Sequence, residues 1–99
     1  MVYVGPLFNC KPYRSKSWRY THACHLLSED LDELHMLAKK IGLKRAWFQD
    51  HGTPHYDLNK SKRLRAIEAG AIEIDMNREA QLIRAWRLKR KGDNRCPTL

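Results

Sequence analysis

The fold class follows from residues 18–49, which read WRYTHACHLLSEDLDELHMLAKKIGLKRAWFQ. The first ten of these residues are rich in aromatic and small side chains and predict a strand. A helix is expected next, because Ser28 or Asp30 can cap its start and Gly42 can end it. Four apolar residues recur at helical spacing and form its expected buried stripe: Leu31, Leu34, Ala38 and Ile41. Residues 43–49 predict a second strand, so the stretch forms one strand–helix–strand unit.

The rest of the chain adds a second unit of the same kind. The other expected elements are, in chain order, a strand over residues 2–4, a loop over 50–58, a helix from about 60 to 69, a strand over 71–75 and a helix over about 78–91. Such units favour parallel strands. We therefore expect a single α/β domain over residues 1–91, in the order β-β-α-β-α-β-α, with about three helices and a mainly parallel sheet of about four strands. Residues 92–99 are expected to form a flexible tail.

Length and charge exclude several classes of protein. A chain of 99 residues has room for one core, which excludes a two-domain enzyme. It contains no apolar run of the roughly 18 to 20 residues that span a bilayer and begins without a signal peptide, so we expect a cytoplasmic protein with no membrane partner. The net charge of +8 favours an anionic partner, namely a nucleotide, a nucleic acid or an acidic protein surface. The three widely spaced cysteines are expected to be free thiols.

The densest group of reactive side chains lies in the loop expected over residues 50–58. It consists of His51, His55, Tyr56 and Asp57. His55 and Asp57 are candidates for general acid–base catalysis, and ligands of open α/β sheets bind beyond the carboxyl ends of strands, where this loop is expected. The alternative is a surface loop in which Asp57 or Asn59 caps the next helix and Tyr56 packs on the core.

A metal site is a second interpretation of the histidines. If His25 lies at the end of its strand, it could meet His35 from the following helix and His55 from the loop, and zinc or another divalent ion would accept this three-histidine set. The alternative is that His25 and His35 are partly buried histidines that donate hydrogen bonds to the backbone. No cofactor is required by these patterns, and a divalent metal is the one they would admit.

A phosphate site is expected at the start of the helix that begins near residue 60. Lys62 and Arg63 lie there, where unpaired backbone N–H groups and the helix dipole favour anions. The expected ligand pocket is lined by His25, His35, Gln49, Tyr56, Lys62 and Arg63. The alternative for the cations is a solvated helix face.

The last helix predicts an accessory basic surface. Its cations are Arg78, Arg84, Arg87, Lys89, Arg90 and Lys91. Basic residues interleaved with an aromatic side chain, here Trp86, suit nucleic-acid binding. The alternative is that Trp86 packs against the sheet while the cations stay in solvent.

Several short blocks carry a resemblance to a known family. They are Cys24-His25-Leu26, Glu33-Leu34-His35, GLKRAWFQD over residues 42–50, Pro54-His55-Tyr56-Asp57-Leu58, Ser61-Lys62-Arg63 and Gly70-Ala71. Over about residues 2–75 the chain resembles the small bacterial and phage family catalogued as domain of unknown function 4031 (DUF4031). Members usually begin with a Val-Tyr-Val-Asp-like strand, and here Gly5 stands in place of that Asp. The resemblance implies that His25, His35, His55, Tyr56, Asp57, Lys62 and Arg63 belong to one shared pattern, and it implies no activity.

Three hypotheses for function follow, and they leave open whether the protein is an enzyme. The first is a binding protein for a phosphate-bearing ligand, a nucleotide or a nucleic-acid backbone, at the His/Tyr/Arg pocket. The second is a metal-assisted phosphodiester hydrolase or nuclease that uses the histidines and Asp57. The third is a phage-encoded interaction or inhibitor protein that uses its basic ends.

Overall fold

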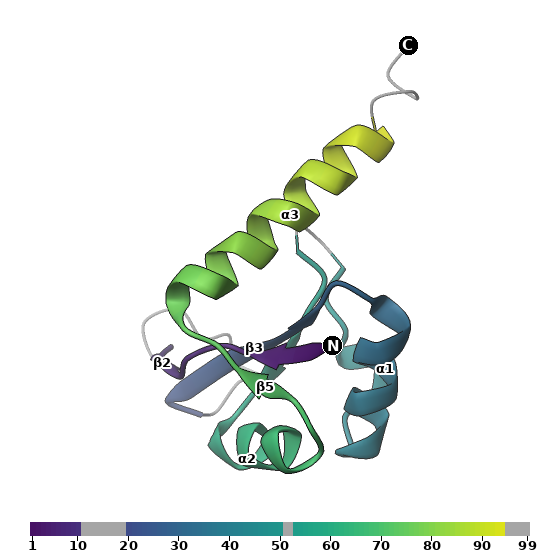
Figure 1. Ribbon diagram of the computed structural model, residues 1–99. Helices are drawn as coiled ribbons and strands as arrows, with labels where there is room; N and C mark the ends of the chain where they lie inside the picture. Colours follow the sequence, from purple (N-terminus) through teal and green to yellow (C-terminus); the bar gives the residue numbers. More distant parts are fainter. Residues whose placement is uncertain (11–19, 51–52, 95–99) are drawn as a thin grey trace.

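A mixed β-sheet lies between one long helix and a pair of shorter helices (Figure 1). The computed structural model describes residues 1–10, 20–50 and 53–94. The elements are β1 (Val2–Val4), β2 (Phe8–Asn9), β3 (His22–Ser28), α1 (Leu31–Lys40), the 3₁₀ helix η1 (Arg45–Trp47), β4 (Tyr56–Leu58), α2 (Lys60–Glu68), β5 (Ile72–Glu73) and α3 (Met76–Asn94). The described residues thus form a small α/β domain, as predicted.

The sheet is mixed, so the prediction of a mainly parallel sheet is wrong. The central strand β3 pairs antiparallel with β1, β2 and β4, and the parallel pair is β1 with β5. Strands β1, β2, β4 and β5 therefore run in one direction and β3 runs in the other. The prediction failed because the first strand–helix–strand unit returns the chain beside β3 in the opposite direction.

The strand expected over residues 43–49 is not formed. Its middle residues make η1, in which Arg45 and Trp47 are both exposed, and Gln49 alone makes an isolated antiparallel bridge, to His55. The strand beside β3 is instead β4, within the expected loop. There the buried Tyr56 and Leu58 flank a half-buried Asp57, which is the alternation that a strand with one apolar face requires.

The helix boundaries follow local signals closely. The Asp30 carboxylate accepts from the backbone N–H groups of Asp32 and Glu33 at the start of α1, and Asn59 caps α2 in the same way. Gly42 and Gly70 follow these helices with φ of 86° and 111°, a conformation that favours glycine. The third helix runs over 76–94 rather than 78–91, so the first three residues of the expected tail are helical, and residues 95–99 lie outside the described part of the chain.

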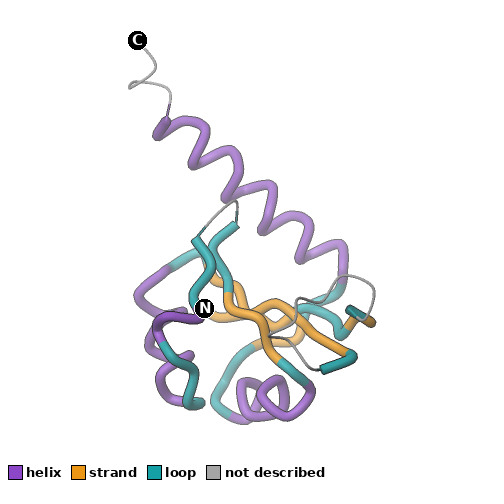
Figure 2. The backbone as a smooth tube through the Cα atoms, turned by 180° about the vertical axis from the view of Figure 1, so that it is seen from behind, coloured by secondary structure: helices purple, strands orange, loops and turns teal. Residues whose placement is uncertain are grey.

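The two faces of the sheet are covered by different helices (Figures 1 and 2). Alternate residues of β3 point to opposite faces. Cys24 and Leu26 belong to the main core, which lies against α1 and α2. The members of that core are Val2, Val4, Cys24, Leu26, Leu34, Ala38, Ile41, Leu43, Tyr56, Leu58, Ala66 and Ala71. His25, between Cys24 and Leu26, therefore points to the other face, toward α3.

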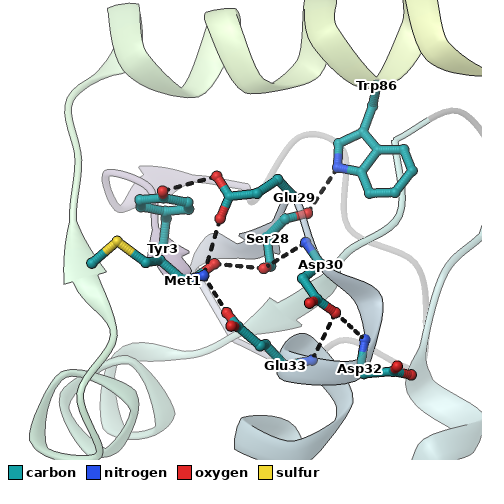
Figure 3. Close-up of polar contacts among 8 residues, drawn as sticks. All are labelled: Met1, Tyr3, Ser28, Glu29, Asp30, Asp32, Glu33 and Trp86. Carbon is teal, nitrogen blue, oxygen red and sulfur yellow. Dashed lines mark hydrogen bonds and ion pairs between the residues drawn. The ribbon is translucent and has the colours of Figure 1, made fainter.

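Trp86 joins α3 to the sheet through a hydrogen bond (Figure 3). The indole Nε1 of the buried Trp86 donates to the backbone oxygen of Ser28 at 2.8 Å, at the end of β3. The C-terminal end of α3 extends beyond the rest of the domain (Figure 2). Among the described residues, no helix is long and apolar enough to cross a membrane.

Candidate functional site

Two histidines and an aspartate gather on the face of the sheet that α3 covers. His25 of β3 stands directly opposite Asp57 of β4 in the strand register. His55 precedes Asp57 by two residues, so the two side chains share this face. One potential ligand atom from each of the three residues lies within 4.8 Å of the others. The structure therefore brings together the predicted catalytic pair, His55 and Asp57, and two of the three predicted metal ligands, His25 and His55.

Both imidazole rings present the same nitrogen to one carboxylate oxygen. His25 Nε2 lies 3.8 Å from Asp57 Oδ1, and His55 Nε2 lies 3.5 Å from the same oxygen. The side chains of His25 and Asp57 are about 30% exposed, and that of His55 is 16% exposed. All three side chains are therefore partly open to solvent.

The remaining polar atoms of His55 and Asp57 are held by other groups. His55 Nδ1 lies 2.7 Å from the backbone oxygen of Thr53, which can only accept, so Nδ1 carries a hydrogen. In the neutral ring the lone pair is then on Nε2. Asp57 Oδ2 accepts a hydrogen bond from Gln49 Nε2. This leaves His55 Nε2 and Asp57 Oδ1 as the atoms with coordinating capacity.

His55 and Asp57 each shift the pKa of the other in the direction that favours its charged form. Burial acts to lower the pKa of His55, but the Asp57 carboxylate and the Thr53 carbonyl outweigh burial, and the pKa is raised above its usual value. Burial acts to raise the pKa of Asp57, but hydrogen bonds from His55 and Gln49 outweigh it, and this pKa is lowered. These opposite shifts favour the protonated imidazole and the ionised carboxylate, so protons and a metal cation compete for His55 Nε2.

A fourth residue at this site, Glu79, was missed by the sequence analysis. It lies in the first turn of α3, and its Oε1 is 3.3 Å from His25 Nδ1. In the sequence it is indistinguishable from the acidic residues that commonly stabilise helix N-termini, so no local signal separated it from them. Its role depends on how α3 packs on the sheet.

A family comparison covers this site. The model of the family described as "Protein of unknown function (DUF4031)" matches residues 12–86, which is more than half of the 99-residue chain. The chain belongs to the DUF4031 family. The resemblance was expected over about residues 2–75, whereas the family model matches residues 12–86 of this DUF4031 protein. The matched range therefore includes Glu79 and Trp86 and leaves out Gly5. Searches of curated proteins and of solved structures found no match.

The third histidine of the expected metal set lies elsewhere in this DUF4031 protein. His35 of α1 is on the opposite face of the sheet, where its Nδ1 is 2.8 Å from the hydroxyl of Tyr56 and its ring packs edge-on against Phe48. Burial, followed by the charge of Arg45, lowers the pKa of His35, and burial raises the pKa of Tyr56. The three-histidine cluster therefore does not form, because β4 turns Tyr56 and Asp57 to opposite faces.

Two predicted phosphate ligands are occupied by contacts within the fold. Lys62 Nζ donates to the backbone oxygen of Ile41 at 2.8 Å. Arg63 Nε donates to the backbone oxygen of Gly5 at 3.1 Å, and its Nη1 lies 3.3 Å from the exposed Glu73 carboxylate. The expected ligand pocket is thus divided: His25 and Gln49 lie at the cluster, His35 and Tyr56 on the other face, and Lys62 and Arg63 between α2 and the neighbouring backbone.

The cations of α3 are mostly in solvent, while Trp86 packs on the sheet, as the alternative interpretation of this helix expected. Arg78, Arg84, Arg87 and Lys89 are exposed. Arg90 pairs with the carboxylate of Asp50. The side chain of Lys91, and all of His51, lie outside the described residues.

Proposed function

We propose that this DUF4031 protein is a metal-dependent hydrolase of phosphodiester bonds. The observation that carries the proposal is the convergence of His25 Nε2, His55 Nε2 and Asp57 Oδ1 on one point. Two imidazoles and one carboxylate suit Zn²⁺ and other divalent transition metals, and three protein ligands leave coordination positions for water and substrate. This is the second of the three hypotheses from the sequence, with His35 removed from the ligand set.

The chemistry follows from the ligand set. A divalent metal lowers the pKa of a bound water to near neutrality and neutralises charge on a phosphoryl oxygen. Held by His25, His55 and Asp57, such a metal would supply this activation of water for attack on phosphorus, and the overall hydrolysis would consume one water, with the leaving oxygen protonated from solvent.

The substrate class is inferred from charge. The chain carries a net charge of +8, and the exposed Arg84 and Arg87 lie on the same helix as Glu79. At about 1.5 Å of rise per residue, Arg87 is roughly 12 Å along the helix axis from Glu79. A nucleic-acid strand bound at the metal through one phosphate would also be attracted by this positive charge, with a salt-dependent gain in affinity.

The experiment measures metal and turnover together. Protein stripped with EDTA is titrated with Zn²⁺, Mn²⁺ and Co²⁺ by calorimetry, and hydrolysis of bis(p-nitrophenyl) phosphate and of a labelled single-stranded oligonucleotide is followed with each metal. We expect one bound metal and metal-dependent cleavage, both lost in His55→Ala. His22→Ala is the matched control, because His22 lies on the same strand as His25 but points to the other face.

Each other outcome favours one of the remaining hypotheses. Stabilisation by nucleotides without metal or cleavage would support a phosphate-binding protein instead. Metal-independent, salt-sensitive oligonucleotide binding that survives His55→Ala but fails in Arg84→Ala/Arg87→Ala would support the interaction protein. Either result overturns the hydrolase.

A further inference from the structure

The carboxylate of Glu79 is placed in a costly environment. Its side chain is 18% exposed, and its Oε1 is buried without a hydrogen-bond partner among the described residues. His25 Nδ1 lies 3.3 Å away, but the two atoms are not aligned as a hydrogen bond. A buried carboxylate oxygen without a partner destabilises a fold, so a site that retains one calls for a functional explanation.

Gly5 provides the space that this carboxylate occupies. A Cβ atom at position 5 would lie 2.0 Å from Glu79 Oε1 and 2.8 Å from Glu79 Cδ. The φ of Gly5 is not in the positive region, unlike those of Gly42 and Gly70, so the backbone conformation does not call for glycine here. What glycine allows at position 5 is the approach of α3's carboxylate to the backbone beside His25, whose oxygen accepts from Gly5 N at 3.0 Å.

The side chains of His55 and Asp57 are already held by hydrogen bonds through the polar atoms that do not face the metal position, Nδ1 and Oδ2. Thr53 oxygen lies behind His55, and Gln49 lies behind Asp57. Histidine ligands of metals commonly donate their second ring N–H to a carboxylate or a carbonyl, which fixes the tautomer and the ring orientation. Glu79 stands in the corresponding position behind His25, on the Nδ1 side, while Nε2 points toward Asp57.

We propose that Glu79 is a positioning residue of the metal site. Its carboxylate accepts a hydrogen bond from His25 Nδ1 when His25 Nε2 binds the metal. Gly5 is required because a side chain at position 5 would displace this carboxylate. A small rotation of the His25 ring on metal binding aligns the 3.3 Å contact, as polar contacts in metal-free sites often tighten on binding. This inference rests on the proposed metal site and adds α3 to it.

The test is a double-mutant cycle on metal affinity. Glu79→Gln removes the charge, and Gly5→Ala displaces the carboxylate without changing any charge. We expect each to weaken Zn²⁺ and Co²⁺ binding by about 10- to 100-fold, which is the usual effect of losing such a partner. The double variant should bind metal as tightly as the single variant with the lower affinity, since the two substitutions remove the same interaction. Glu68→Gln, an exposed residue of α2, is the charge-matched control and should bind like the parent.

Two further readouts separate positioning from a merely structural role. The visible spectrum of bound Co²⁺ should change in Glu79→Gln, because the orientation of the His25 ligand changes. In EDTA, Glu79→Gln should unfold at the same temperature as the parent protein or a higher one, because it replaces a carboxylate whose buried Oε1 has no hydrogen-bond partner with a neutral amide. A structural residue would show the reverse, with lower stability and an unchanged spectrum.

The outcomes distinguish this inference from the proposed function. If the parent protein binds no metal, both are overturned. If the parent binds metal and Glu79→Gln and Gly5→Ala bind it as tightly as Glu68→Gln does, the metal site stands and the role of Glu79 is overturned. A double variant whose loss equals the product of the two single losses also overturns it, since Gly5 and Glu79 would then act independently.

Discussion

Tyr56 and Asp57 are adjacent in β4, yet their side chains lie on opposite faces of the sheet. Tyr56 is buried in the main core, where its hydroxyl meets His35. Asp57 is half-buried on the α3 face, where it meets His25 and His55. One strand therefore serves a structural aromatic cluster on one side and a candidate metal site on the other, and substitutions on the two sides should have separable effects.

Replacement of the Tyr56 hydroxyl should lower stability and leave metal affinity unchanged. Tyr56→Phe removes a single hydrogen bond, that to His35 Nδ1, at a cost of about 1 kcal/mol. Urea unfolding in EDTA measures the first effect, and calorimetric titration with Zn²⁺ measures the second. A tenfold loss of metal affinity in this variant would contradict the assignment of the two residues to separate faces.

His55 and His35 should give opposite slopes of stability against pH. The pKa of His55 is raised, so its stabilising contribution is complete below its unfolded value of about 6.5 and is lost as the pH rises through the folded value. The pKa of His35 is lowered, so its contribution is present above about 6.5 and is lost as the pH falls through the folded value.

Single substitutions separate the two slopes. We expect the difference in the free energy of unfolding between the parent and His55→Gln to shrink from pH 6 to pH 9. For His35→Gln the corresponding difference should shrink as the pH is lowered from 7.5 to 5. Urea unfolding in EDTA at half-unit pH steps measures both, and slopes of the same sign in the two variants would contradict the opposite directions of the two pKa shifts.

Loosening α3 should weaken the metal site from a distance. Trp86→Phe keeps an aromatic ring but leaves the buried backbone oxygen of Ser28 without its donor, at a cost of about 1 to 2 kcal/mol. Because the same helix carries Glu79, Zn²⁺ affinity should fall as well. Thermal unfolding and calorimetry test this together, and Leu88→Phe on the exposed side of α3 is the control. A destabilised Trp86→Phe protein with full metal affinity would indicate that the helix N-terminus docks independently.

The thiol of Cys24 should resist alkylation in the native protein. Burial raises the pKa of Cys24 to about 12, and its side chain faces the core. A thiol in this state is almost entirely protonated at pH 8 and reacts slowly. Peptide mass mapping after iodoacetamide treatment should find Cys24 unmodified in buffer and modified in 8 M urea. Rapid native labelling would mean that this region opens far more often than its packing implies.

The helices could be predicted because their signals are local. Asp30 and Asn59 cap α1 and α2, and Gly42 and Gly70 follow them, within a few residues of the elements that they delimit. The direction of β4 could not be predicted, because it depends on how the chain returns to β3 after α1. The strand expected over residues 43–49 failed for a related reason. Its aromatic content favoured a strand, but within the described part of the chain its only strand-like pairing is the Gln49–His55 bridge.

By itself the sequence determined the side-chain chemistry of the candidate site and much of the helical framework. It placed His25, His55 and Asp57 among the candidates, because their types and their nearness to expected strand ends are local properties. Only the tertiary structure decided which of them meet. Strand pairing sets His25 opposite Asp57 and turns Tyr56, with His35, to the other face. The packing of α3 brings Glu79 over Gly5, a contact across most of the chain that no local pattern encodes.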